Sequence, residues 1–409
     1  MSNSNEKQIS MGVLLVLNLL IGFVISNINL GVAPILATIA GTYPDVAKSS
    51  IQGLMTTPSY LALAFGLLAG VLNTKFSVKK LLAVGISWFA VMGLVPLFVT
   101  DFTVLSICRI LTGFSAGMVV PTSVTFIMSY YPKEKIATAL GIQTAAVTGG
   151  QIIVNMLGGK LGAVQYNKFF MLYFVVAVAA VCIILLLPDR GPIKAKKAEG
   201  GLKQYFTWQS LVFAVFPGLF WVGYTAYTSN IAFFIAQYFA GDAAMTGTVS
   251  AIGNVLSVIA GLLLGTFHKK FKNNLTGICL LGLAVGYGIL GFATTSYALV
   301  VFSQMVIGFF MACVISHSRL CASSCVIPAG ITLVNGFCTI FINVFKLSAN
   351  HILNGISTAV FGNSDPAPVF LVAAVLTAIF GVLWILYVAY INAHPVVVNG
   401  EELHLPEAK

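Results

Sequence analysis

Long apolar runs, separated by short polar breaks, fill most of the chain. An α-helix needs about 20 mainly apolar residues to cross the hydrocarbon core of a bilayer, and these runs have that length. They predict twelve membrane-spanning helices, at about 11–38, 51–73, 79–100, 102–129, 137–162, 166–187, 207–239, 244–267, 274–294, 297–320, 329–355 and 369–392. The first run is too long for the core of a signal peptide, so we expect it to remain as the first span. The pattern predicts an all-α polytopic membrane protein.

One long polar stretch interrupts this pattern inside the chain. It begins PDRGPIKAKKAEGG at Pro188, and it divides the twelve runs six and six. We therefore expect four parts along the chain. These are an N-terminal six-helix half at 1–187, a cytoplasmic basic linker at 188–206, a C-terminal six-helix half at 207–393 and a cytoplasmic tail at 394–409.

The two halves also repeat each other when the chain is shifted by 195 residues. Small residues then coincide: Gly66 with Gly261, Gly70 with Gly265, and Gly113 with Gly308. Parallel repeats of this kind place two related six-helix halves about a pseudo-two-fold axis, with a substrate site near the middle of the membrane. The repeat predicts a transporter that moves one half against the other.

Composition and charge agree with a membrane protein. The chain is 58% hydrophobic and 8% charged, whereas soluble domains are about 25% charged. Of the 21 Lys and Arg residues, three lie in predicted outer loops (Lys48, Lys160 and Lys168) and two lie in spans, which leaves 16 on the inner side. This bias predicts that both termini are cytoplasmic, and it accounts for the net charge of +10 without a nucleic-acid partner.

Short motifs carry a family resemblance. The stretch GVLNTKFSVKK at 70–80 is similar to the inner-loop signature of the major facilitator superfamily, although Thr74 stands where the family has an acid. The stretch RILTGFSAG resembles the family's fourth-helix pattern at Arg109, Gly113 and Gly117. The resemblance implies alternating access, gated by two inner loop motifs. Their residues are Gly70, Lys75, Lys79, Lys80, Gly265, Lys269 and Lys270.

One branch of that family is only partly matched. Proton-driven drug antiporters carry Gly-x-x-x-Gly-Pro-x-x-Gly-Gly on the fifth helix. The stretch GQIIVNMLGG at 150–159 keeps three of these glycines but has Val154 and Asn155 in place of Gly-Pro. The incomplete motif weakens an assignment to drug efflux and leaves it open as an alternative.

The predicted spans hold cations but no acids. All eleven Asp and Glu residues fall in loops, tails or helix ends, whereas Arg109 and Lys346 fall within spans. A charged side chain inside a membrane is costly and usually functional. The interior field therefore favours an anion.

Lys346 belongs to a polar stripe on the eleventh predicted helix. Asn343, Lys346 and Asn350 recur at helical spacing, and the repeat places Gln151 and Asn155 of the fifth helix opposite Lys346 and Asn350 in the alignment. Oxalate/formate-type antiporters of the superfamily are similar in having a cavity lysine on this helix, a resemblance confined to Lys346. The alternative is that Lys346, about four residues past the predicted helix centre, extends to the outer interface.

Other polar residues in spans have two interpretations each. Arg109 would either contact the anion or support the fold, with Asn27 of the first helix as its expected neighbour. Tyr224 and Tyr227 would either grip a substrate or form an interface belt. His317 and His351 would be either proton-sensitive groups or packed polar residues.

No other chemistry stands out in the sequence. Cys321 and Cys325 are four residues apart without a second pair, so neither a metal nor a cofactor is predicted, and no catalytic constellation indicates an enzyme. We predict a monomeric multi-pass transporter of the plasma membrane that moves a small organic anion by exchange or symport. The alternatives are a drug or metabolite exporter and, outside transport, a membrane receptor.

Overall fold

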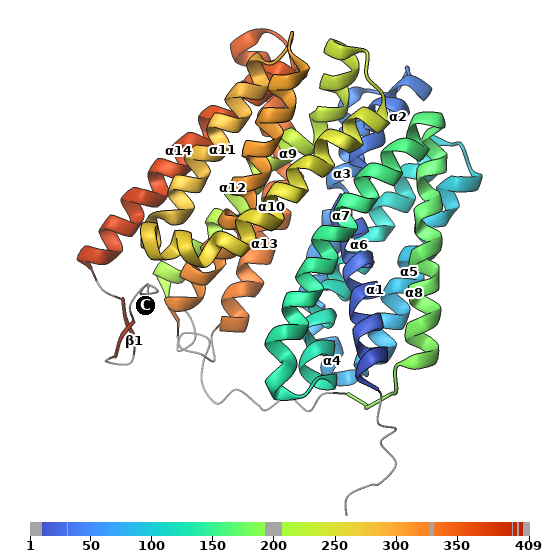
Figure 1. Cartoon of the computed structure of the whole chain (residues 1–409), viewed down its shortest axis with the longest axis vertical. Helices are drawn as coiled ribbons and strands as arrows, with labels where there is room; N and C mark the ends of the chain where they lie inside the picture. Colours follow the sequence, from blue (N-terminus) through green and yellow to red (C-terminus); the bar gives the residue numbers. More distant parts are fainter. Residues whose placement is uncertain are drawn as a thin grey trace, which may run out of the picture. The chain divides into compact units, whose positions relative to one another are not determined.

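The computed structural model describes residues 10–30, 32–192, 207–326, 331–394, 396–398 and 401–403. Helices dominate it (Figure 1). The first half contains α1 (Met11–Leu30), η1 (Ala33–Ile35), α2 (Leu36–Thr42), α3 (Lys48–Thr56), α4 (Pro58–Lys75), α5 (Val78–Phe98), α6 (Phe102–Tyr130), η2 (Lys133–Lys135), α7 (Ile136–Val164), η3 (Tyr166–Leu172) and α8 (Tyr173–Leu186). The second contains α9 (Trp208–Phe239), α10 (Ala243–Phe271), η5 (Lys272–Asn274), α11 (Leu275–Phe292), α12 (Tyr297–Ser324), α13 (Ile331–Phe361) and α14 (Pro366–Ala393). A short antiparallel hairpin follows, made of β1 (Val396–Val398) and β2 (Glu401–Leu403), with Val397 paired to Glu402.

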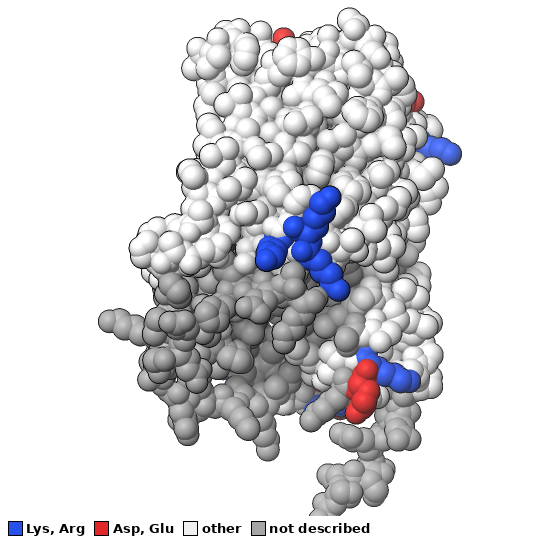
Figure 2. Space-filling view, turned by 60° about the vertical axis from the view of Figure 1, so that its left-hand side comes forward, with Lys and Arg blue, Asp and Glu red and all other residues white. Residues whose placement is uncertain are grey.

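The predicted spans coincide with helical segments, so the all-α membrane fold is confirmed. Among the described residues, nine helical stretches are long and apolar enough to cross a membrane. One of the nine, Ala243–Phe292, contains two predicted spans, the eighth and the ninth. The surface agrees with this, because Leu262 and Phe292 are among the most exposed large apolar side chains. Figure 2 shows one face of the molecule. Among the described residues on this face, the few Lys and Arg side chains lie in small groups, and most of the surface is uncharged.

Two predicted spans are broken, which corrects the sequence analysis. The run at 11–38 is divided, because α1 ends at Leu30 and η1 begins at Ala33 with a proline in its first turn. The run at 51–73 is divided at Thr57, because Pro58 opens α4. Proline has no N–H to continue the hydrogen-bond ladder and is favoured at the first position of a helix.

The Cα positions form two compact units, Met1–Lys197 and Ala198–Lys409. In the first unit, α1 packs against α7, and α6 packs against both α4 and α5. In the second unit, α9 packs against α13, and α12 packs against both α10 and α11. The contact between α1 and α7 thus corresponds to that between α9 and α13. The contacts of α6 with α4 and α5 correspond to those of α12 with α10 and α11. The cytoplasmic placement of the linker and the tail stays a prediction.

The boundaries of the helices carry the same repeat. The helix starts Lys48 and Ala243, Phe102 and Tyr297, and Ile136 and Ile331 each differ by 195 residues. A close crossing repeats as well. A Cβ at Gly113 would collide with the Pro58 carbonyl group, and one at Gly308 would collide with the Gly253 carbonyl group. Pro58 and Gly253 are themselves 195 residues apart, so the proline explains why α3 and α4 are separate where α10 is continuous.

Acids occupy the starts of helices, outside the helical segments. The carboxylate of Asp101 accepts the N–H of Val104 at 2.9 Å at the start of α6, and that of Asp242 accepts the N–H of Met245 at 2.9 Å at the start of α10. Asp365 holds the same position before α14. The carboxylates of Asp101 and Asp242 cap unpaired N–H groups, and all three acids complement the positive end of a helix dipole.

Candidate functional site

Lys346 is the middle residue of α13. The helix runs from Ile331 to Phe361, so fifteen residues lie on each side of Lys346. At 1.5 Å per residue, either end is about 22 Å away along the axis. This corrects the expected offset from the helix centre. The alternative that Lys346 extends to the outer interface stays a prediction.

Trp221 on α9 is the aromatic partner of Lys346. The Lys346 Nζ lies 4.9 Å from the centre of the Trp221 ring, which is within the range of a cation–π interaction. The two helices approach closely one turn earlier, because a Cβ at Gly218 would meet the backbone of Phe341 and the ring of Phe345. Sequence reasoning missed Trp221, although it stands three residues before Tyr224 on the predicted helix.

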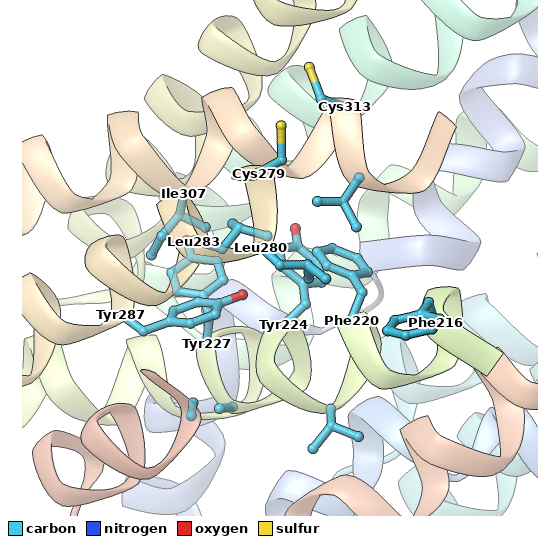
Figure 3. Packing of buried hydrophobic residues seen from close by; sticks show 14 of the residues in the cluster. Phe216, Phe220, Tyr224, Tyr227, Cys279, Leu280, Leu283, Tyr287, Ile307 and Cys313 are labelled. Atoms are coloured by element: carbon cyan, nitrogen blue, oxygen red, sulfur yellow. The ribbon is translucent and has the colours of Figure 1, made fainter. Parts of the chain in front are cut away.

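An aromatic cluster continues from Trp221 along α9. Tyr224 stacks on Phe220 with ring centres 5.5 Å apart, and Trp221 meets Tyr224 edge-on at 5.2 Å. Tyr227 follows at 5.8 Å from Tyr224, and its hydroxyl lies 2.8 Å from the Ser250 Oγ of α10. Figure 3 shows Tyr224 and Tyr227 of α9 among packed apolar side chains of the second half. Both tyrosines are buried, at 8% and 3% exposed, so they do not form an interface belt.

The stripe on α13 is polar and largely shielded. Asn350 is buried, while Asn343 and Lys346 are half-buried. The Asn343 amide donates to the Thr339 carbonyl oxygen of its own helix at 2.9 Å. His351 is exposed, so it stands apart from the buried part of the stripe.

The equivalent stripe of the first half contains an unsatisfied amide. Asn155 on α7 is 1% exposed, and neither atom of its amide has a hydrogen-bond partner among the described residues. Gln151 is half-buried one turn before it. Burying an amide without partners costs about 1–3 kcal/mol. Such a group is expected where a ligand or water supplies the missing bonds.

On α1, Asn27 bonds within its own helix. Its amide donates to the Phe23 carbonyl oxygen at 3.1 Å. The neighbouring Ser26 faces α7 closely, because a Cβ at Gly150 would meet the Ser26 hydroxyl. The structure therefore places Asn27 on the helix that packs against the α7 stripe.

Arg109 connects three helices through hydrogen bonds to residues other than the expected Asn27. Its Nε donates to the Leu54 carbonyl oxygen of α3 at 3.1 Å, and its Nη1 lies 3.5 Å from the hydroxyl of Tyr173 on α8. The amide of Asn27 donates to the Phe23 carbonyl oxygen and not to Arg109. Arg109 is buried, so the geometry supports a structural role.

The basic motif of the first half includes an acid from elsewhere in the chain. Lys75 ends α4 and Lys79 and Lys80 open α5, while the Lys80 Nζ lies 4.0 Å from a carboxylate oxygen of Asp189, after α8. The N–H of Gly191 donates to this carboxylate at 2.9 Å. That hydrogen bond, followed by one from Ser77 and the charges of Lys80 and Lys79, lowers the pKa of Asp189. Asp189 thus supplies a carboxylate to a motif that lacks one at Thr74.

In the second half, the corresponding residues are helical. The helix α10 continues to Phe271, so Lys269 and Lys270 lie in its last turn and Gly265 lies one turn earlier. The expected loop between the two spans is therefore shorter than the sequence suggested, and the 3₁₀ turn η5 fills it.

His317 is buried and contacts polar side chains of two other helices. The sequence indicated His317 as a candidate residue but did not indicate these partners. Its Nε2 lies 3.0 Å from the Nδ1 of His268 on α10, and its Nδ1 lies 2.8 Å from the Thr276 Oγ1 of α11. His268 was not predicted as a site residue. The repeat could have indicated the pair. His268 and His317 align with Asn73 and Thr122, so both halves have two polar residues at these helix positions.

Among the described residues, no group of three or more His, Cys, Asp or Glu side chains is placed to hold a metal ion. The cysteines are all free thiols. The candidate binding groups among the described residues are therefore the Lys346 and Arg109 charges, the side-chain amides, the aromatic cluster of α9 and the histidine pair.

Comparisons with known proteins agree with this architecture. The family model described as Major Facilitator Superfamily matches residues 14–345. "Quinolone resistance protein NorA" of Staphylococcus aureus is 28% identical over 116 residues, which cover 28% of this chain and 29% of that protein. "Multidrug resistance protein 1" of Bacillus subtilis is 27% identical over 269 residues, which cover 62% of this chain and 66% of that protein. The chain thus spans less than two thirds of the length of these relatives.

Solved structures show the same fold. The nucleoside transporter NupG has a TM-score of 0.72 at 14% identity, covering 92% of this chain and 99% of that chain. A bacterial homologue of the lysosomal transporter Spinster has a TM-score of 0.67 at 14% identity, covering 95% and 97%. The family model covers most of the chain, and so the protein belongs to the major facilitator superfamily of multi-pass membrane transporters and is not an enzyme.

Proposed function

We propose that this transporter moves small organic anions and that Lys346 is the charge that binds their carboxylate group. The observation that carries the proposal is the position of Lys346 at the middle of α13, over the Trp221 ring. A central position on a helix of this length is where transporters of this architecture bind substrates.

The charge balance of the second half supports an anionic substrate. Between Asp242 and Asp365 the sequence contains no Asp or Glu. The same stretch contains five cations, which are Lys269, Lys270, Lys272, Arg319 and Lys346. Helices α10 to α13 therefore carry positive charge only, and their summed field attracts anions.

Trp221 stabilises the ammonium group without neutralising it. The face of an aromatic ring attracts a cation through its quadrupole, typically by about 0.5–2 kcal/mol, and it carries no net charge. The contact with the Trp221 ring therefore leaves the charge of the Lys346 ammonium group unchanged. The amide of Asn350, one turn after Lys346 on the same helix, would provide hydrogen bonds to the rest of the substrate.

Transport would follow alternating access, by exchange or symport, in a monomer of the plasma membrane with both termini in the cytoplasm. The basic segments at Lys75, Lys79 and Lys80 and at Lys269 and Lys270 would form the cytoplasmic gates. This orientation follows from the bias of Lys and Arg toward one set of loops.

The first experiment is a thermal-shift screen of the purified protein against formate, acetate, lactate, oxalate and succinate. A ligand at one hundred times its Kd stabilises the native state by about 2.7 kcal/mol. Loss of a charge-assisted hydrogen bond is worth about 1.5–3 kcal/mol, so Lys346→Gln should weaken binding roughly 10- to 150-fold. Lys160→Gln is the matched control, because it removes the same charge at an exposed position on α7. If no anion shifts the parent, or if Lys346→Gln responds like Lys160→Gln, the proposal is wrong.

Drug efflux is the second candidate function. The partial sequence similarity to NorA and to Multidrug resistance protein 1 favours it. The aromatic cluster of Phe220, Trp221, Tyr224 and Tyr227 also suits a flat lipophilic cation. This function predicts that ethidium is expelled from cells by the parent and equally by Lys346→Gln.

A further inference from the structure

We propose that transport is coupled to protons and that the His268–His317 pair is the site that binds the coupled proton. The proposal rests on the proposed transport of an anion for its direction, which would be symport. It does not depend on Lys346, because the pair lies on different helices and has its own partners.

The pair connects three helices of the second half. The His268 Nδ1 of α10 and the His317 Nε2 of α12 are 3.0 Å apart, and the His317 Nδ1 is 2.8 Å from the Thr276 Oγ1 of α11. His317 is 1% exposed. A hydrogen bond between two ring nitrogens requires that one carries a proton and the other does not.

This arrangement accepts one additional proton without moving any heavy atom. In the neutral pair, the His317 Nε2–H donates to His268 and the His317 Nδ1 accepts from the Thr276 hydroxyl. When His268 becomes protonated, its Nδ1–H donates to the His317 Nε2. His317 then carries its own proton on Nδ1 and donates to the Thr276 oxygen. Both states satisfy every ring nitrogen that faces the cluster, so the pair can hold zero or one extra proton.

A second extra proton does not fit. Both facing nitrogens would then carry hydrogen, so the bond between the rings would be lost and two positive charges would lie side by side. The ring centres are only 5.1 Å apart. The pair is therefore a one-proton site.

Other charged and titratable groups around the pair are few. From α12, the Cys321 Sγ lies 3.7 Å from the His317 Nδ1, and Arg319 follows two residues after His317. From α10, Lys269 follows His268, and from α14 the neutral Trp384 ring lies 6.5 Å from the His317 ring. The charges of Arg319 and Lys269 and the burial of His317 disfavour protonation of the pair when no anion is bound. A bound anion in the same half would offset both, so proton and anion binding should reinforce each other.

Carboxylates, the usual proton carriers of transporters, occupy other places in this chain. Asp101 and Asp242 cap the starts of helices, and Asp365 stands at the start of α14. Of the remaining histidines, His351 is exposed, His394 follows the last helix and His404 lies outside the described residues. Within the described helices, the pair thus joins the buried ring of His317 to the half-buried ring of His268, and imidazole is the side chain whose ordinary charge change falls between pH 5 and 8.

The repeat shows that packing does not require histidine at this crossing. Asn73 and Thr122 precede His268 and His317 by 195 residues each, and the Asn73 amide donates to the Thr122 hydroxyl at 3.3 Å. The first half thus makes the same contact between α4 and α6 with groups that do not titrate. Only the second half has a proton-binding contact there.

This correspondence supplies a matched variant. The double substitution His268→Asn with His317→Thr transfers the first-half contact to the second half, keeping a hydrogen bond while removing the titration. His351→Gln is the control that removes an exposed histidine. Histidine ¹⁵N resonances of the purified parent, followed from pH 5 to 8 without any anion, report whether the pair binds a proton.

Flux in proteoliposomes tests the coupling. Oxalate uptake is followed with and without an imposed gradient of about one pH unit, and if no carboxylate binds, ethidium replaces oxalate. One coupled proton raises accumulation by up to about tenfold under that gradient. We expect this gain in the parent and in His351→Gln, and its loss in the double variant, which should still carry out uptake without a gradient.

Two results overturn the proposal. One is the absence of a change in the protonation of either ring between pH 5 and 8. The other is an undiminished response to the gradient in the double variant. Failure of all five carboxylates to bind contradicts the anion proposal instead, and the ethidium measurement then decides the coupling on its own.

Discussion

The crossing of α10 and α12 at Gly308 allows a quantitative prediction. A Cβ at Gly308 would overlap the carbonyl group of Gly253, which is backbone and cannot rotate away. The Ser257 hydroxyl also donates to the Gly308 carbonyl oxygen at 2.6 Å across this contact. Gly308→Ala must therefore separate the two helices and stretch that hydrogen bond.

The expected cost combines two terms. Overpacking a close contact costs about 1–3 kcal/mol, and weakening a buried hydrogen bond costs about 0.5–1.5 kcal/mol. Alanine recovers about 1 kcal/mol of helix propensity. The net destabilisation should thus be about 0.5–3.5 kcal/mol, or roughly 1–14 °C in the apparent Tm.

The assay is the apparent Tm of the protein in detergent, followed by the fluorescence of a thiol-reactive dye. Gly261→Ala is the matched control, because Gly261 lies on α10, the other helix of the crossing, with no neighbouring atom within 4 Å of its added Cβ. It should leave the Tm unchanged or raise it. A Gly308→Ala protein as stable as Gly261→Ala would refute the close crossing, and with it the structural argument for the repeat.

Three further substitutions test other parts of the structure. Arg109→Gln should lower the apparent Tm, because it leaves the buried Leu54 carbonyl oxygen without its hydrogen bond, at a cost of about 1–3 kcal/mol. Ligand affinity in thermal-shift titrations should not change. A selective loss of affinity would indicate that Arg109 contacts the anion instead. Asn155→Leu should raise the Tm and abolish flux in proteoliposomes, since it removes an unsatisfied buried amide proposed to face the substrate, and retained flux would contradict that role. The pKa of Asp189 is lowered in the folded state, so its contribution to stability is present above its ordinary pKa and is lost as pH falls through the lowered value. The Tm difference between the parent and Asp189→Asn should therefore disappear in acid, and a difference that grows on acidification would contradict the cited contacts.

The sequence predicted the fold well because the signals are local and strong. Spans of this length need no tertiary information, since every segment in lipid must satisfy its own backbone groups as a helix. The breaks before Ala33 and Pro58 were missed because hydropathy does not register the loss of a single N–H. The repeat was visible in glycines such as Gly113 and Gly308, whose role as helix crossings only the structure revealed.

Side-chain partners were predicted less well, since they depend on how helices rotate against each other. Lys346 and the tyrosines were found from their helical spacing, but Trp221 became a partner only through the close approach at Gly218. Arg109 was paired with Asn27 by expectation, whereas its hydrogen bonds go to Leu54 and Tyr173. Asp189 and His268 could not be assigned because each meets its partner from a distant part of the chain.

The positions at which the two halves differ indicate where function lies. Duplication would give both halves the same residues at equivalent positions, so a change of charge needs a reason, which is structural for Arg109 opposite Gln304 because Arg109 connects three helices. Gly113 and Gly308 serve the same crossing in both halves. By contrast, Gln151 is replaced by Lys346, Asn73 by His268 and Thr122 by His317. Each change introduces a charged or titratable group into the second half at a place where the first half is neutral. Because such groups are costly inside a membrane, their retention there needs a functional reason. The proposed anion at Lys346 and the proposed proton on the histidine pair would together provide one for all three.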